Sequence, residues 1–236
     1  MANENIGFIT VRNGVKLRDS PAREACFKIV TDQTGMAKFP EGSLDFRREN
    51  LHGDMNEEVQ SLEIAAQTIV DFPETTWEMK MELARQCWDE TRHARLFLRR
   101  LRELGGHKGQ YPIINQEWGV ICMLDSLSGR LAVQNRVFEA GSLDVFKEGA
   151  EIFAQWGDPE TAAILEGVLA DEISHIRFAN NWLKSLKNTD PKALLKAVAA
   201  MSSVKAWAAA LTPPEHKMEH AIPVNEEDRR LAGFTD

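Results

Sequence analysis

The pattern of apolar and polar positions along this chain is mostly that of amphipathic helices. From residue 51 onward, apolar residues recur three and four positions apart, the spacing that gives a helix one apolar face. Five long stretches follow this pattern: residues 55–72, 75–104, 130–156, 159–186 and 191–211. No segment sustains the strict alternation of a β-strand, so the sequence predicts an all-α protein.

Short breaks between the first four helices favour an antiparallel four-helix bundle. Pro73 follows the first helix, and Gly105 and Gly106 end the second. The run Gly157-Asp158-Pro159 divides the third helix from the fourth, with Asp158 as the expected N-cap. Helices joined by such short connections pack side by side and run in opposite directions.

The chain is expected to form one structural domain with three parts. Residues 1–50 contain several prolines and glycines and should form an N-terminal extension that packs on the bundle, with a short helix over residues 20–30. Residues 51–186 form the four-helix bundle. Residues 187–236 add a C-terminal helix and an extended, mostly polar tail.

Composition and charge narrow the class of protein. The net charge of −8 and a pI near 5.4 argue against a nucleic-acid-binding protein held by its overall charge. Three widely spaced cysteines without a C-x-x-C pair fit a reducing compartment. Because the sequence shows no signal peptide and no apolar membrane span, we expect a cytoplasmic protein without a membrane partner.

Two copies of the motif Glu-x-x-His are the main chemical feature of the chain. Glu90 and His93 lie in the second predicted helix, and Glu172 and His175 lie in the fourth. Both glutamates fall within the apolar stripe of their helix, and burying a lone carboxylate is costly unless a partner compensates its charge. A shared metal cation is the simplest partner. The alternative is that these residues form surface salt bridges with neighbouring arginines.

The first helix offers two candidate ligands, Glu58 and Glu63. Glu58 lies closer to the apolar stripe, and it is as far before the turn at Pro73 as Glu90 is after it. Two residues at equal distances from a turn face each other in an antiparallel pair. Glu58 is therefore the predicted ligand, and Glu63, about 7 Å out of register, is the alternative.

Glu139 is the predicted ligand in the third helix, and Asp144 is the alternative. Glu139 lies farther from the turn at Gly157 than Glu172 does, so a kink or bulge near Gly141 and Ser142 is expected to absorb the difference.

Four further polar residues lie next to these ligands. Asn135 and Arg136 precede Glu139, and Asp89 and Asp171 each precede a motif glutamate. Either aspartate could bond the ligand histidine of the neighbouring helix and so orient its ring. For all four residues, a position on the solvated surface is the alternative.

The set of four glutamates and two histidines is typical of carboxylate-bridged metal pairs. Hard carboxylate oxygens suit iron and manganese and can bridge two ions, whereas zinc fingers and calcium loops need other donors. We therefore expect two metal ions, an Fe/Fe pair first and a Mn/Fe pair as the alternative.

With this set of residues the chain resembles the ferritin-like superfamily, and most closely a bacterial ferritin-like family known only as a domain of unknown function. The resemblance covers most of residues 51–186 and is carried by four segments, "EEVQSLEIAAQTI", "DETRHARLFLRRLRELGG", "RLAVQNRVFEAGSLDV" and "DEISHIRFANNWL". It implies a four-helix bundle that holds two metals between the six residues above. The family often has a histidine before the first ligand, where this chain has Glu57.

The functional expectation is a dimetal oxidoreductase that activates dioxygen and oxidises a small substrate, with an electron donor that the sequence does not identify. The alternatives are a tRNA-modifying diiron hydroxylase and an iron-storing ferroxidase. A radical-generating subunit would need a tyrosine near the metals, and the only tyrosine, Tyr111, lies in a predicted loop. Nucleic acid is not expected as a partner, and a homodimer is the assembly that we consider.

Overall fold

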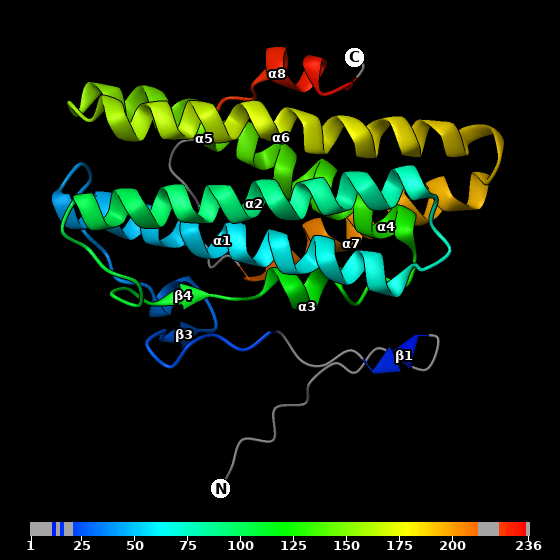
Figure 1. Cartoon of the computed structure of the whole chain (residues 1–236), viewed down its shortest axis with the longest axis horizontal. Coiled ribbons are helices and arrows are strands. Elements are labelled where there is room, and N and C mark those ends of the chain that lie inside the picture. The colour runs from blue at the N-terminus through cyan, green and yellow to red at the C-terminus, as the bar shows by residue number, and fades with distance from the viewer. Residues whose placement is uncertain (1–10, 13–14, 17–20, 212–221, 235–236) are drawn as a thin grey trace, which may run out of the picture.

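The computed structural model describes residues 11–12, 15–16, 21–211 and 222–234 of the 236-residue chain. Within this part the protein is all-α, as the sequence predicts, with long helices that lie side by side (Figure 1). None of the described helices is both long and apolar enough to cross a membrane.

The helices α1 (Leu44–Asp71) and α2 (Trp77–Glu103) form one antiparallel pair. Ser43 caps α1 by accepting a hydrogen bond from a backbone N–H of the first turn, and Thr76 caps α2 in the same way. At the end of α2, Gly105 takes a positive φ of 82°, a conformation that residues with a Cβ rarely adopt.

The second antiparallel pair consists of α5 (Glu139–Gln155) and α6 (Pro159–Ser185). Asp158 caps α6, as predicted, by accepting the backbone N–H of Thr161. A π-helical segment, Gln134–Phe138, joins α5 to the short preceding helix α4 (Leu127–Val133) without a loop between them.

Short elements and one further helix surround the two pairs. They are the strands β1 (Val11–Arg12), β2 (Val15–Lys16), β3 (Ile29–Val30) and β4 (Ile113–Ile114), and the helices η1 (Gln33–Gly35), α3 (Glu117–Ile121), η3 (Leu186–Asn188), α7 (Pro191–Leu211) and α8 (Glu226–Leu231). β1 pairs with β2 in antiparallel fashion, and β3 pairs with β4 in parallel. α7 confirms the fifth predicted helix, packs against α4, and lies behind α1 and α2 in the view of Figure 1.

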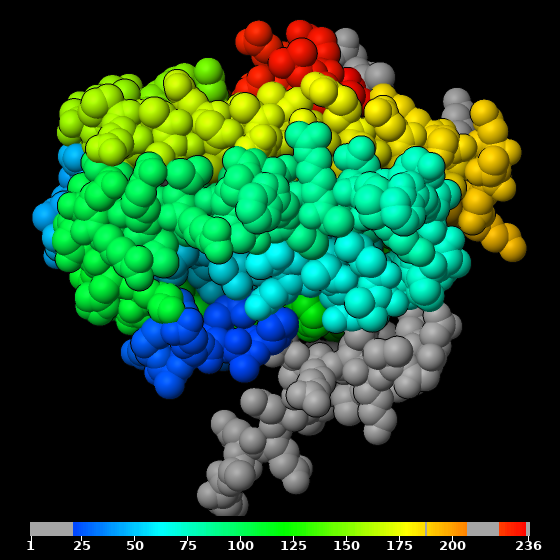
Figure 2. Space-filling view, viewed as in Figure 1, coloured from blue at the N-terminus to red at the C-terminus, as the bar shows by residue number. Residues whose placement is uncertain are grey.

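The main hydrophobic core lies between the two helix pairs. Each long helix contributes at least one fully buried side chain to it: Leu51, Phe97, Leu143 and Val168. Burying a side chain of this kind contributes about 1.5–3 kcal/mol to folding. In a space-filling view, α6, α2 and α1 form three neighbouring bands across one face of the molecule, with α2 in the middle (Figure 2).

Two local predictions about the N-terminal part are wrong. Residues 21–30 form a turn and the strand β3, and not the predicted short helix over residues 20–30, of which residue 20 lies outside the described part. The first long helix begins at Leu44, well before the predicted start at residue 55, because Ser43 caps it. The prediction did not use this N-cap.

The N-terminal segment contacts the helix α1 and the main core. Arg23 bonds both carboxylate oxygens of Glu63 on α1, at 2.7 and 2.9 Å, and Phe27 packs against the main core. Of the predicted tail, residues 212–221 lie outside the described part, and residues 226–231 form α8.

Candidate metal centre

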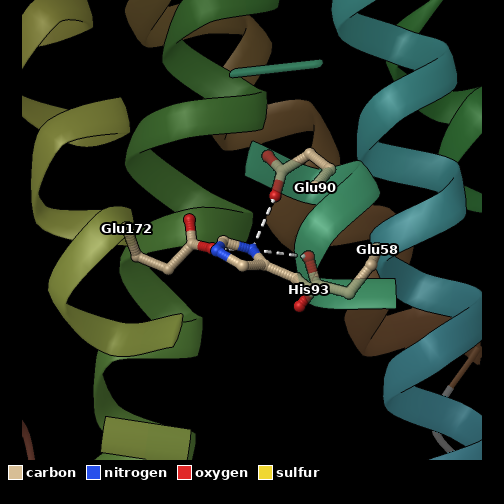
Figure 3. Close-up of side chains that lie close together, drawn as sticks. All are labelled: Glu58, Glu90, His93 and Glu172. Atoms are coloured by element: carbon tan, nitrogen blue, oxygen red, sulfur yellow. Dashed lines mark hydrogen bonds and ion pairs between the residues drawn. The ribbon is translucent and has the colours of Figure 1, made fainter. Parts of the chain in front are cut away.

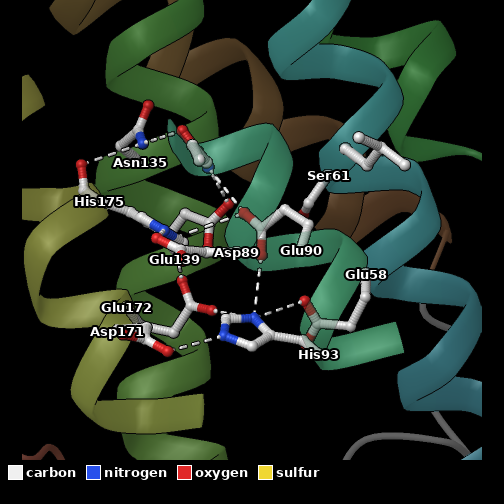
Figure 4. Close-up of polar contacts among 12 residues, drawn as sticks. Glu58, Ser61, Asp89, Glu90, His93, Asn135, Glu139, Asp171, Glu172 and His175 are labelled. Atoms are coloured by element: carbon white, nitrogen blue, oxygen red, sulfur yellow. Dashed lines mark hydrogen bonds and ion pairs between the residues drawn. The ribbon is translucent and has the colours of Figure 1, made fainter. Parts of the chain in front are cut away.

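Six ionisable side chains from the two helix pairs meet in the interior of the bundle (Figure 4). α1 and α5 contribute one residue each, and α2 and α6 contribute two each: Glu58, Glu90, His93, Glu139, Glu172 and His175. Each of them is at most 6% exposed to solvent. They are the six residues predicted from the sequence, and the structure brings all of them together.

The ring of His93 lies at the centre of a first group (Figure 3). Its Nδ1 is 3.2 Å from Oε2 of Glu58 and 3.1 Å from Oε2 of Glu90. The same nitrogen is 3.3 Å from Oε1 of Glu172. Three carboxylates from three helices therefore converge on one imidazole nitrogen.

The ring of His175 lies in a second group, next to the first. Its Nδ1 is 2.9 Å from Oε2 of Glu172 and 3.4 Å from Oε1 of Glu90. Glu139 completes this group, whose ligand atoms all lie within 4.8 Å of one another. The centroids of the two imidazole rings are 6.2 Å apart.

Glu90 and Glu172 belong to both groups and divide their oxygens between them. Glu90 points Oε2 toward His93 and Oε1 toward His175. Glu172 does the reverse, with Oε1 toward His93 and Oε2 toward His175. Two carboxylates arranged in this way are suited to bridge two neighbouring cations.

The two aspartates that precede the motif glutamates bond the histidines of the opposite helix pair. Nε2 of His93 on α2 is 3.2 Å from Oδ2 of Asp171 on α6, and Nε2 of His175 on α6 is 3.2 Å from Oδ2 of Asp89 on α2. Arg92 bonds both aspartates through Nη2, with 2.8 Å to Asp171. Each Nε2–H thus donates to a carboxylate, which leaves Nδ1 of each ring facing the centre.

Buried amides surround the carboxylates on the other side of the site. Gln86 Nε2 donates to Oε1 of Glu90 at 3.0 Å and to Oε1 of Glu139 at 2.9 Å, and Gln134 Nε2 donates to Glu139 at 2.6 Å. Asn135 donates to Oε1 of Gln86 and to the backbone carbonyl of His175. Sequence reasoning missed both glutamines, although Gln86 lies one turn before Glu90, a spacing that indicates a shared helix face.

The π-helical segment explains how Gln134 reaches Glu139. These residues are five apart, and the i to i+5 pattern of a π-helix stacks such positions on one face. The predicted irregularity therefore exists, but it precedes Glu139 and does not lie at Gly141 and Ser142, where the helix is regular.

Burial sets the protonation of the outer carboxylates. Loss of solvation raises the pKa of Glu58 and of Glu139 well above the usual value, and neighbouring carboxylates raise both further. Burial also opposes ionisation of Glu172, but the charge of His175 and hydrogen bonds from Glu139 and the two histidines lower its pKa well below the usual value.

The surrounding carboxylates favour the protonated form of both histidines. Burial alone would lower the pKa of His93, yet hydrogen bonds to Glu172, Glu58 and Glu90 raise it far above the usual value. The charges of Glu172 and Glu90 do the same for His175, also against burial. Burial opposes ionisation of Asp89 as well, but its bonds with His175 and Arg92 bring its pKa well below the usual value.

The structure places the remaining predicted candidates away from the centre. Glu63 is paired with Arg23, and Asp144 binds Arg229 of α8 at 2.6 Å. Arg136 donates to Asn180 and stacks on the ring of Phe234, so it contacts none of the six residues. Among the predicted neighbours, Asn135, Asp89 and Asp171 are part of the network.

The chemistry of this donor set fits a metal cation. Two imidazolium rings can balance two carboxylates at most, so all four buried glutamates can be ionised together only if a cation compensates their charge. The buried Glu and His side chains could therefore hold a metal ion. Oε1 of Gln134 and Oδ1 of Asn135, which have no hydrogen-bond partner within the described residues, are two further oxygens in the buried polar layer beside it.

Comparison with known proteins identifies the family. The model of the family described as "Protein of unknown function (DUF455)" matches residues 2–236. The chain belongs to this family. No curated protein and no solved structure matches the DUF455 chain. The all-helical structure with its buried glutamates and histidines is compatible with a ferritin-like fold, and the chemistry must be inferred from the site itself.

Proposed function

We propose that this protein is a ferritin-like oxidoreductase that binds two iron ions between α1, α2, α5 and α6 and uses them to activate dioxygen. The observation that carries the proposal is the way Glu90 and Glu172 each direct one oxygen to His93 and the other to His175. Carboxylate-rich sets with one imidazole for each metal favour iron or manganese over zinc or calcium. A Mn/Fe pair would use the same donors.

The residues divide into terminal and bridging ligands. In this proposal Glu58 and His93 would hold one metal, Glu139 and His175 would hold the other, and Glu90 and Glu172 would be shared between them. Each histidine binds through Nδ1, because its Nε2 is held by an aspartate of the opposite helix. Bound ferrous ions would supply the electrons and the open coordination positions that the reduction of dioxygen requires.

The surroundings of the site favour oxidation of a small substrate over iron storage. All six ligands are nearly or fully excluded from solvent, so only small molecules reach the centre without a rearrangement of the bundle. Gln86 and Gln134 hold the oxygens of Glu90 and Glu139 by hydrogen bonds that restrict their movement. Arg92 bonds both aspartates, and each aspartate is within hydrogen-bond distance of the Nε2 of one imidazole.

The test is oxygen consumption by the ferrous protein. Anaerobic protein loaded with two equivalents of Fe(II) should consume oxygen rapidly on mixing and develop a visible absorption band, whereas Glu172→Ala treated in the same way should do neither. Binding of one zinc ion with no oxygen consumption would contradict the proposal. Accumulation of hundreds of iron atoms per assembly would indicate storage instead.

A further inference from the structure

The outer face of α2 carries a row of large exposed side chains. Trp88 is 59% exposed, and Arg95, Arg99 and Arg102 are exposed at successive spacings of seven, four and three residues. These spacings place all four residues on one face of the helix. We call this face, from Trp88 to Arg102, the α2 arginine face. It belongs to the middle band of the surface in Figure 2.

The arginines of this face are largely free to meet a partner. Together with Leu98 and Glu103 they line a surface hollow of about 470 Å³. The side chain of Arg99 pairs with Glu103 at 3.4 Å, but the side chains of Arg95 and Arg102 form no hydrogen bond or ion pair with any described residue. On a chain with a net charge of −8, such a local excess of positive charge marks a surface for an anionic partner.

One end of this face, from Trp88 to Arg95, is level along α2 with the candidate ligands Glu90 and His93. Arg92, between Trp88 and Arg95 on α2, has a side chain that is 39% exposed. Its Nη2 bonds Asp171, whose carboxylate in turn bonds Nε2 of His93. Two hydrogen bonds thus connect the protein surface to a candidate metal ligand. They provide a short path for an electron from the surface to the buried site.

We propose that the α2 arginine face is the docking surface of an acidic one-electron carrier protein. The inference rests on the proposed function, since a diiron oxygenase must be reduced again after each turnover. On docking, the carrier would be oxidised by one electron and Fe(III) reduced to Fe(II), so two docking events restore the diferrous pair without any bond being formed or broken.

The dimensions and chemistry of the face fit a protein better than a small anion. The fifteen residues from Trp88 to Arg102 span about 21 Å of helix. That length suits the small, weakly bound interfaces of electron-transfer proteins, in which charge steers the encounter. An exposed tryptophan beside arginines is also a typical interface anchor.

Reduction kinetics of the full chain test the proposal. The iron-loaded, oxidised protein is mixed anaerobically with each of the pre-reduced ferredoxins and flavodoxins of the same organism, at low and high ionic strength. The test variant is Arg95→Glu/Arg99→Glu/Arg102→Glu. The control, Lys192→Glu/Lys196→Glu/Lys205→Glu, makes the same charge change at exposed positions of α7. Dithionite serves as a reductant that needs no docking site.

The expected result is that at least one carrier reduces the wild type rapidly, and that this rate falls with ionic strength. The α2 variant should be at least about tenfold slower and the α7 control within about twofold of wild type, because only the first loses the complementary charge. Dithionite should reduce all three proteins equally.

Three results would overturn the proposal. The first is that none of these carriers reduces the wild type rapidly, and the second is that the two variants are reduced at equal rates. The third is specific tRNA binding that only the α2 variant loses, which would assign the face to a nucleic acid. If dithionite-reduced protein fails to consume oxygen, the proposed function itself is wrong. The experiments therefore distinguish a failure of the docking proposal from a failure of the proposed oxygen-activating function.

Discussion

At the scale of single residues, the centre consists of carboxyl groups and imidazoles whose pKa values burial and mutual contacts shift from the usual range. Each histidine Nδ1 donates to carboxylates that a cation would bind. The raised pKa values of His93 and His175 mean that both rings carry two protons near neutral pH. Metal ligation requires neutral imidazole and ionised carboxylate, so binding must displace protons.

The first prediction is that metal binding at pH 7 releases about two protons or more per chain, one from each imidazole and any held by the outer carboxylates, Glu58 and Glu139. Calorimetric titration with Fe(II) in buffers of different ionisation enthalpy measures this number. Apparent affinity should therefore rise with pH. Binding without proton release would show that the histidines are not ligands.

The second prediction compares Glu172, a candidate ligand on α6, with Glu63, the alternative candidate on α1. Glu172→Ala should lose at least one of the two proposed metals, because Glu172 belongs to both groups of candidate ligands. Glu63→Ala should keep the wild-type metal content, because Glu63 is bound to Arg23 outside the centre. Elemental analysis of both purified variants decides the matter. Loss of metal from the Glu63 variant alone would contradict the assignment.

At the scale of elements, buried polar contacts fix how the helices meet. Arg130 of α4 and Asp71 at the end of α1 form an ion pair in which both side chains are 1% exposed. Arg130 also donates to the backbone carbonyls of Leu124 and Cys122. Because neither charge reaches water, the pair ties the start of the third helical segment to the turn between α1 and α2.

The third prediction is that Asp71→Ala lowers the free energy of unfolding by about 3–5 kcal/mol, since it leaves Arg130 buried without its counter-charge. Urea denaturation measures the loss. The matched control is Glu103→Ala, whose ion pairs with Arg99 and Arg100 lie at the surface and should contribute less than about 1 kcal/mol. Similar losses in both variants would contradict this role of the buried pair.

The fourth prediction concerns the contact between α1 and the loop after α2. His52 is fully buried between the rings of Phe27 and Tyr111 and accepts the backbone N–H of Gly109 through Nε2. Burial lowers the pKa of His52 to about 4. The unfolded chain, with its ordinary pKa, therefore binds the proton more readily than the folded one.

Stability that His52 contributes is present at pH 7 and is lost as the pH falls from about 6.5 to about 4. Over this range the wild type should lose about 1–3 kcal/mol more than His52→Gln, which keeps an acceptor for Gly109 but does not titrate. Urea denaturation at several pH values gives the comparison. Parallel pH profiles for the two proteins would show that His52 is not buried as a neutral ring.

The sequence predicts elements and site residues whose signals are local and repeated. The spacing Glu-x-x-His within an apolar stripe indicated two of the helices that carry the site, and the equal distances of Glu58 and Glu90 from their turn indicated how the first two helices meet. The sequence does not locate the π-helical segment, because its position depends on hydrogen bonds from Gln86 to Glu139 and from Gln134 to Ser61 that cross between helices. The start of α1 at Leu44 was missed because residues 44–54 lack a continuous apolar stripe.

At the scale of the whole molecule, the two helix pairs bring distant parts of the chain to one point. α1 and α2 supply one half of the ligand set, and α5 and α6 supply the other, so neither half can hold two metals alone. The aspartates that cross between α2 and α6 connect the halves. Metal binding should therefore stabilise the packing of one pair against the other, because only the folded chain presents all six donors.

The most direct test of the central claim is anomalous X-ray diffraction, at the iron absorption edge, from crystals of the iron-loaded protein. Two adjacent peaks are expected, both within bonding distance of oxygens of Glu90 and Glu172, with Nδ1 of His93 near one peak and Nδ1 of His175 near the other. A single peak, peaks located elsewhere, or an interior without any peak in crystals that contain iron would contradict the central claim.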